Sequence, residues 1–282
     1  MMQTTEYAFS NSAAAAQTQL AAIQGFLDPL TRRRILELDL PRDGVCWDVG
    51  AGAGSIATWL AQDIVPDGRV VATDIDTSRL ADPQAANLDV HRADVATEPA
   101  PPGGPFDLIH ARLVTQHLPS RRELLSRLVD ALKPGGWLML GEFDCTRPPR
   151  VICAPSQRDR ELFDRFLRTL IGVLTARGVD MAWACQAHSA MSAAGLSQVH
   201  SVTHVESWTG GGHGCRLYEA SCFQLEEPLL AAGLTAADLT RIRELTEDRA
   251  FTANSYTFVS TRGQRGSGLR LVAPYDAAGG QQ

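Results

Sequence analysis

Three glycines on alternate positions, with an acid in front of them, are the first residues whose types and spacing suggest chemistry. The stretch "CWDVGAGAGSIATWLA" (46–61) passes from an apolar run through Asp48 to Gly50, Gly52 and Gly54, and continues as helix-like sequence. A glycine-rich turn between a strand and a helix lets the backbone approach a ligand at the helix N-terminus. The pattern predicts a ligand-binding loop.

The loop alone is compatible with several ligands. A phosphate-binding P-loop would close on a Lys-Ser/Thr pair, but Ser55 follows Gly54 with no lysine nearby, which excludes it. A dinucleotide site would read GxGxxG, whereas this loop reads GxGxG with Ser55 in place of the third glycine. A tight strand-to-helix turn without a ligand would also use alternate glycines. The residues around the loop are needed to choose between these ligands.

Three acids stand where a nucleoside with a cationic tail could use them. Asp48 lies inside the first predicted strand, where a buried carboxylate would repel a diphosphate and attract an ammonium or sulfonium group. Asp74 closes the second predicted strand and could accept hydrogen bonds from both ribose hydroxyls. Asp94 follows the third strand and could accept one from an adenine amino group, although an acid there is also often a helix cap.

The elements that must position these residues alternate between short apolar runs and longer amphipathic ones. This alternation predicts parallel strands covered by helices on both faces. The first part of the chain reads as strands at 45–49, 70–74, 88–92, 106–110 and 136–143, helices at about 14–38, 55–64, 78–86 and 120–132, and a turn at 133–136. The later part reads as helices at 157–177, 180–194 and 234–248, strands at 198–208 and 255–261, and a glycine-rich loop at 209–214.

Composition narrows the class of partner. The net charge is -6, from 26 basic and 32 acidic residues without a long basic run, so the footprint of a nucleic-acid binder is missing. No stretch has about 18 consecutive apolar residues, which argues against a membrane partner. The six cysteines include no CxxC pair and the N-terminus does not read as a secretory signal, so we expect a reduced, cytoplasmic protein.

Several motifs in order resemble those of a known family. "DVGAGAG", "VVATDID", "HRADV" and "FDLIHARLVTQHLP" followed by "LKPGGWLMLGEFD" are similar to the motifs of class I S-adenosylmethionine-dependent methyltransferases, especially small-molecule enzymes of bacterial secondary metabolism and antibiotic biosynthesis. The resemblance implies an α/β, Rossmann-like, doubly wound sheet of seven strands with the last one antiparallel. It also implies an N-terminal helical cap (1–40), a core (41–262) with helical insertions at about 155–195 and 209–250 over the active site, and a disordered tail (263–282).

The same resemblance implies S-adenosyl-L-methionine as the methyl donor and assigns residues to it. The loop glycines would line its methionine and ribose portions, Asp74 would hold the ribose, and Asp94 with Val95 would frame the adenine. Asp48 would orient the loop or the amino group, the backbone from His110 to Arg112 would close over the sulfonium, and Tyr7 would cap the donor. The implied cofactor-binding residues are Tyr7, Asp48, Gly50, Ala51, Gly52, Asp74, Ile75, Ala93, Asp94, Val95, His110 and Arg112.

Methyl transfer is an in-line displacement that depends mainly on holding two reactants together, an effect of about 7 to 11 kcal/mol in favourable cases. A hydroxyl acceptor also needs a base, and a histidine titrates near neutral pH. His117 is the candidate, and the alternative is a packing role. Glu142 and Asp144 could act as a base or bind a cationic acceptor, or could cap the next loop. No metal is expected, because no ligand set has a suitable spacing.

The expected partner is a small, largely apolar acceptor that is methylated on oxygen, nitrogen or carbon, and a homodimer is compatible with the sequence. Two alternatives stay open: a protein of the same fold that catalyses a cyclisation or rearrangement, or senses a ligand, without methyl transfer; and an NAD(P)-dependent oxidoreductase. Aromatic candidates for the acceptor pocket are Phe26, Phe163, Phe166, Trp183, Trp208, Tyr218 and Phe223.

Overall fold

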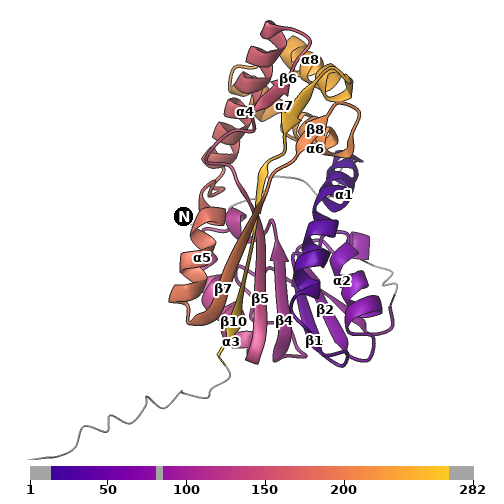
Figure 1. The fold of residues 1–282 in the computed structure, drawn as a ribbon, viewed down its shortest axis with the longest axis vertical. Coiled ribbons are helices and arrows are strands. Elements are labelled where there is room, and N and C mark those ends of the chain that lie inside the picture. Colours follow the sequence, from indigo (N-terminus) through magenta and orange to yellow (C-terminus); the bar gives the residue numbers. More distant parts are fainter. Residues whose placement is uncertain (1–13, 81–84, 267–282) are drawn as a thin grey trace, which may run out of the picture.

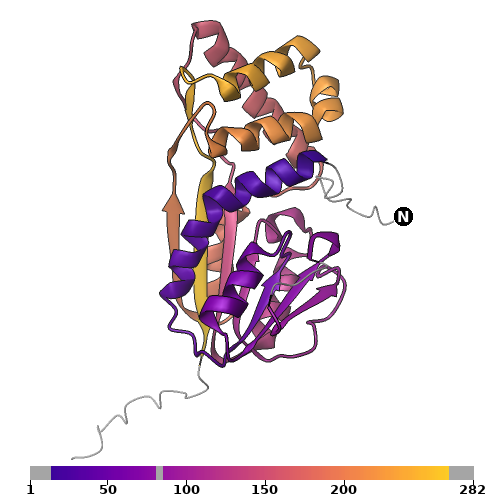
Figure 2. The same cartoon turned by 90° about the vertical axis from the view of Figure 1, so that its right-hand side faces the viewer.

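A seven-stranded sheet with helices on both faces forms one end of the molecule, and a smaller lobe of helices lies beyond the far end of its long strands (Figure 1 and Figure 2). The structure is a computed structural model that describes residues 14–80 and 85–266. Among the described helices, none has the length and apolar character needed to cross a bilayer.

The strand order in the main sheet is β3-β2-β1-β4-β5-β10-β7. The strands are β1 (Val45–Val49), β2 (Arg69–Asp74), β3 (Leu88–Arg92), β4 (Phe106–Arg112), β5 (Leu132–Asp144), β7 (Leu196–His204) and β10 (Thr257–Arg265). Strands β1 to β5 pair in parallel, whereas β10 pairs antiparallel with both β5 and β7. The expected Rossmann-like, doubly wound sheet with an antiparallel last strand is confirmed. The order reverses between β1 and β4, the place where such sheets bind ligands.

Two apolar cores hold the helices against the two faces of this sheet. On one face, α3 (Arg121–Ala131) and α5 (Trp183–Ala193) pack against β1, β4 and β5. On the other face, α2 (Ser55–Trp59), a π-helical turn (Leu60–Ile64) and the end of α1 (Ala14–Leu36) pack against β1, β2 and β4. Because both faces are covered, the strands are almost continuously apolar.

The lobe has its own core and a small sheet that the sequence did not indicate. It contains the helices α4 (Gln157–Ala176), α6 (His213–Gln224), α7 (Glu226–Ala231) and α8 (Ala236–Glu247) and the strands β6 (Val151–Cys153), β8 (Ser207–Thr209) and β9 (Thr252–Asn254). The strand order is β6-β9-β8. A capping box starts α8, where Thr235 and Asp238 each accept from the other's backbone N–H. The N-terminal half of α1 lies between this lobe and the sheet (Figure 2).

Three expectations about the lobe were wrong. The segment 198–208 is not one strand, because β7 ends at His204 and β8 joins the small sheet. The glycine-rich segment 209–214 is not entirely a loop, because helix α6 begins at His213. The backbone of α6 packs closely against the Trp208 indole, since a Cβ at Gly214 would lie 2.2 Å from that ring. The insertion expected at about 155–195 is too long, because α5 packs on the main sheet rather than in the lobe.

Three expectations about the rest of the chain also change. Only a 3₁₀ turn (Ser78–Leu80) stands where a helix was expected at about 78–86, and residues 81–84 lie outside the described part. The 133–136 turn belongs to β5, where a register shift against β4 and a φ of 84° at Gly135 accommodate it. The disordered tail was expected to begin at residue 263, but β10 pairs with β7 as far as Arg265. Residues 267–282 lie outside the described part.

Candidate active site

The glycine loop after β1 has a backbone that requires glycine. Gly50, Gly52 and Gly54 have φ values of 64°, 60° and 78°, in the left-handed region. At Gly50 a Cβ would also lie 2.3 Å from Cγ2 of Val114, so the turn after β4 approaches the loop closely. The loop is fixed by the end of β2, since the Ala51 N–H donates to the Thr73 carbonyl at 3.0 Å. The loop backbone is therefore preorganised.

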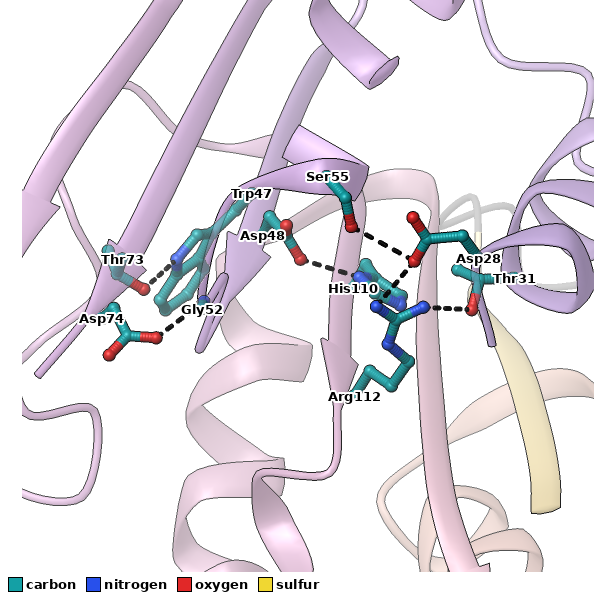
Figure 3. A network of polar contacts seen from close by, with 10 residues as sticks. All are labelled: Asp28, Thr31, Trp47, Asp48, Gly52, Ser55, Thr73, Asp74, His110 and Arg112. Atoms are coloured by element: carbon teal, nitrogen blue, oxygen red, sulfur yellow. Dashed lines mark hydrogen bonds and ion pairs between the residues drawn. The ribbon is translucent and has the colours of Figure 1, made fainter. Parts of the chain in front are cut away.

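Asp74 at the end of β2 connects the loop to the next strand. Its Oδ2 accepts from the Gly52 N–H at 2.8 Å, and its Oδ1 accepts from the Asp76 N–H at 3.0 Å (Figure 3 shows the first of these). Burial raises the pKa of this carboxyl, although the two backbone hydrogen bonds oppose the shift. Each carboxylate oxygen has a second lone pair, so the group can still accept hydrogen bonds from a ligand.

Asp48 and His110 form a buried pair at the switch point of the sheet. The register of β1 and β4 places them side by side, and Asp48 Oδ1 lies 2.7 Å from His110 Nδ1 (Figure 3). The exposed fractions of the two side chains are 4% and 2%. The side chain of His110, and not only its backbone, therefore belongs to the site.

A second polar network fastens α1 to the end of β4 (Figure 3). Arg112 donates to Asp28 at 2.8 Å and to Thr31 at 3.1 Å, and Ser55 donates to the same Asp28 oxygen at 3.1 Å. Arg112 and Asp28 are 11% and 12% exposed, so water screens this ion pair only weakly. The network holds α1 across the carboxyl ends of the strands.

A cavity of about 1000 Å³, open to solvent at its mouth, lies over these residues. The structure places every described residue of the expected cofactor site in its wall; Tyr7 lies outside the described residues. These residues are Asp48, Gly50, Ala51, Gly52, Asp74, Ile75, Ala93, Asp94, Val95, His110 and Arg112. Asp94 is held by the loop after β3, because its Oδ1 accepts from the Ala96 N–H at 2.9 Å.

The sequence analysis expected an N-terminal helical cap and named His117 after β4, but it did not identify the other side chains of α1 and of this turn that line the cavity. Leu20, Ile23 and Gln24 of α1 line the cavity, as do Leu113 and Val114. Leu113 has a φ of 56°, a costly conformation for a branched side chain that is found mainly where a site demands it. An α1 side chain can be assigned to a site only when the path of the helix is known, so the sequence contained no usable signal.

A second cavity of about 690 Å³ lies between the sheet and the lobe. It shares Ile23, Leu113 and His117 with the first cavity, so the two meet at these three side chains. Burial, and secondarily Arg121, lowers the pKa of His117 to about 4. His117 therefore lies where the two cavities meet, as a neutral imidazole at neutral pH.

Glu142 and Asp144, the other two catalytic candidates, line neither cavity. Glu142 is 1% exposed, and its Oε1 accepts from the N–H groups of Thr115 and Gln116 at 2.8 and 3.3 Å. Asp144 accepts from the N–H and hydroxyl of Thr146 at 2.9 and 2.7 Å. Asp144 matches the capping alternative, because it holds the loop after β5. Glu142 instead holds the turn after β4 that carries His117, a role that the sequence did not suggest.

None of the seven aromatic side chains expected in the acceptor pocket lines either cavity. Most of them, including Phe163 and Trp183, are buried in the cores, and Phe223 is exposed. Phe143 and Tyr256 line the second cavity instead, because they lie where β5 and the approach to β10 leave the sheet for the lobe. Within residues 14–80 and 85–266, no group of three His, Cys, Asp or Glu could hold a metal ion.

Comparison with known proteins gives a consistent result. Residues 47–138 match the model of a methyltransferase domain. Methyltransferase str3 of Strobilurus tenacellus is 33% identical over 123 residues, which are 43% of this chain and 42% of the relative. A trans-aconitate 2-methyltransferase of Sinorhizobium fredii is 39% identical over 102 residues, 36% of this chain and 38% of the relative. The chain thus spans less than half the length of these relatives.

Solved structures extend the likeness to the fold. Phosphoethanolamine N-methyltransferase 2 of Haemonchus contortus, bound to phosphomonomethylethanolamine and S-adenosylhomocysteine, has a TM-score of 0.53 at 16% identity, covering 90% of this chain and 58% of that one. The YcgJ protein of Bacillus subtilis has a TM-score of 0.52 at 16% identity, covering 84% and 98%. Taken with the domain match and the position of the glycine loop, these findings show that the chain contains a methyltransferase domain at residues 47–138 and shares its fold with S-adenosylmethionine-dependent methyltransferases.

Proposed function

We propose that this protein transfers a methyl group from S-adenosylmethionine to an oxygen, nitrogen or carbon atom of a small, largely apolar metabolite. The observation that carries the proposal is the first cavity, whose wall combines the glycine loop with Asp48, Asp74 and Asp94.

The chemistry of the cavity wall suits this donor. Three carboxylates favour a ligand with a net positive tail over a diphosphate, whose charges they would repel. Asp74 has lone pairs left for the ribose hydroxyls, and Asp94 lies in the wall for the adenine. When bound, S-adenosylmethionine supplies an electrophilic methyl group.

The protein contributes to the reaction mainly by positioning the donor and the acceptor. Gly50 and Gly52 let the donor approach the backbone, while the Asp48–His110 pair fixes the floor of the cavity beneath it. Leu113 and His117 lie at the opening into the second cavity, so a donor methyl group directed there would meet an acceptor. Where the acceptor is a hydroxyl, His117 is the proposed base; its unprotonated imidazole can accept a hydrogen bond from that hydroxyl.

Isothermal titration with S-adenosylhomocysteine, the demethylated donor, tests the cofactor site. The wild-type protein is expected to bind it, and Asp74→Asn is expected to weaken binding at least about tenfold, because a charge-assisted hydrogen bond is worth about 1.5 to 3 kcal/mol. Asp67→Asn is the matched control, since Asp67 is an exposed acid that pairs with Arg42. Failure to bind, or binding of NADH in its place, refutes the proposal.

Activity then separates transfer from the alternative of a non-transferring relative. Incubation with methyl-labelled S-adenosylmethionine and a small-molecule extract is expected to yield S-adenosylhomocysteine and a labelled product in equal amounts. A product that is rearranged but unlabelled, with the donor intact, identifies a cyclase or isomerase.

A further inference from the structure

The second cavity differs from the first in the charge of its wall. Among its described lining residues there is no Asp, Glu, Lys or Arg, whereas the first cavity contains three carboxylates and an arginine. That arginine, Arg112, is already paired with Asp28 and Thr31 and so has little capacity for a second anion. A charged group in the second cavity would lose its hydration without gaining a partner of opposite sign.

The rest of the wall is mostly apolar and comes from both parts of the molecule. The lobe supplies Leu170, Leu174 and Leu217, while the sheet side supplies Phe143 and Met181. An apolar molecule that enters this space gains from the burial of its surface. The cavity is therefore suited to a small, hydrophobic ligand.

Several polar lining groups are already hydrogen-bonded within the protein. Gln19 accepts from the Gln224 amide at 2.6 Å, and the Ser221 hydroxyl donates to the Leu217 carbonyl at 2.9 Å. Polar groups whose bonds are made within the protein attract a polar ligand group less strongly than groups that lie at the wall with capacity to spare.

Of the remaining polar lining residues, two lie together at the junction with the first cavity, whereas Cys145 and Tyr256 do not line the first cavity. Gln116 and His117 lie next to each other there, with 3.2 Å between the Gln116 amide nitrogen and His117 Nε2. Their backbone is held on two sides: the Gln116 N–H donates to Glu142 at 3.3 Å and its carbonyl accepts from the Asp180 N–H at 2.9 Å. The pair is thus a fixed polar end to an apolar cavity.

We propose that the second cavity is the acceptor site and that it binds an uncharged, mostly apolar molecule whose hydroxyl group faces Gln116 and His117. This inference rests on the proposed methyl transfer. In the reaction, a bond forms between the acceptor oxygen and the methyl carbon while the sulfur–carbon bond breaks, and its electron pair stays on sulfur. The acceptor hydroxyl replaces the Gln116 amide as hydrogen-bond donor to His117 Nε2, and the hydroxyl proton passes to that nitrogen. The imidazole is weak as a base but sufficient, because the oxygen becomes strongly acidic as it is methylated.

The assignment distinguishes this chain from relatives that handle ionised molecules. A trans-aconitate 2-methyltransferase is among the proteins it resembles, and a tricarboxylate requires cationic side chains in its pocket. The described wall of the second cavity has none. Carboxylates should therefore be poor ligands for this site even when they carry the correct hydroxyl.

A matched pair of probes tests this class of ligand. Methyl 4-hydroxybenzoate and 4-hydroxybenzoate share a ring and a hydroxyl but differ in charge, and binding of each to the protein saturated with S-adenosylhomocysteine can be measured by ligand-observed NMR. The ester is expected to bind with a Kd of about 1 mM or lower, and at least about tenfold more tightly than the acid.

Two variants on α4 locate the binding. Leu174 lines the second cavity, whereas Thr175 is the next residue and is exposed. Leu174→Trp is expected to fill the cavity and weaken ester binding at least about tenfold, and Thr175→Trp, which adds a tryptophan outside the cavity, is expected to leave it unchanged.

The outcomes separate this inference from the proposed function. Loss of S-adenosylhomocysteine binding in the wild-type protein would refute the proposed function itself. If that ligand binds, the inference is overturned when the acid binds as well as the ester, when neither probe binds, or when Leu174→Trp binds the ester as the wild type does.

Discussion

Replacement of Glu142 by glutamine tests the structural role that the fold assigns to this side chain. Its carboxylate is buried and accepts hydrogen bonds from Thr115 and Gln116 through Oε1, while Oε2 is buried with no hydrogen-bond partner. The Thr115 hydroxyl also accepts from the Trp183 indole at 2.6 Å, which ties α5 to the same turn. Glutamine keeps the accepting oxygen and removes the charge.

The size of the expected stability change follows from the pKa of Glu142. Burial, opposed by these hydrogen bonds, raises the pKa of Glu142 to about 7, from 4.5 for a glutamate in water. A group whose folded-state pKa is raised stabilises the fold fully below its unfolded pKa and loses that contribution as pH rises through the folded value. Over this window of about 2.5 units the loss is about 3 kcal/mol, at 1.36 kcal/mol per unit.

Urea denaturation at pH 5 and at pH 8 measures the effect. The wild-type protein is expected to lose about 2.5 kcal/mol more between the two pH values than Glu142→Gln does, because the variant lacks the titrating group and pH 5 already lies slightly above the unfolded pKa. Other ionisable groups cancel in this difference. Glu123→Gln, at an exposed position on α3, is the control and should titrate like the wild type. Equal pH dependence in wild type and Glu142→Gln would show that the carboxyl is not the buried anchor inferred here.

The remaining predictions concern the walls of the first cavity. Leu113→Gly is expected to be about 1 kcal/mol more stable than Leu113→Ala in urea denaturation, because Leu113 has a positive φ that glycine adopts more easily. Glycine variants are usually less stable than alanine variants, and that order here would contradict the prediction. Asp28→Asn should lower the free energy of unfolding by about 2 kcal/mol, because it leaves the largely buried Arg112 without its anion. Asp67→Asn, at an exposed position, should lower it by less than about 0.5 kcal/mol, and equal losses would refute the network. Affinity for S-adenosylhomocysteine should fall as the pH drops through the raised pKa of Asp74, because the ribose bonds to the ionised carboxylate; titration calorimetry across pH that finds no such fall contradicts the assignment.

The sheet and the cofactor loop were predictable because their signals are local. Apolar runs marked all five parallel strands, and the glycines with Asp74 and Asp94 occupy the ends of those strands, which a parallel sheet brings to one edge. Topology alone therefore gathered the candidates into one cavity. The sequence could not show that Asp48 would pair with His110, since that contact depends on the register of β1 and β4.

The lobe was less predictable because its elements are short and their partners distant. Strands β6, β8 and β9 each have three residues, too few for a period of two to be visible. They pair across about 100 residues of chain, from Val151 to Ala253. Aromatic residues were poor guides to the acceptor pocket, because large side chains are as useful in a core as in a cavity wall, and Phe163 and Trp183 are fully buried.

Placement of the donor relative to the junction of the two cavities is the most direct test of the account. A crystal structure with S-adenosylhomocysteine should show the ribose hydroxyls against Asp74 and the sulfur beside Leu113, facing His117 and the second cavity. Such a pose would place a transferred methyl group at the acceptor site. Density for the ligand outside the first cavity, or a sulfur directed away from His117, would contradict the assignment of both sites.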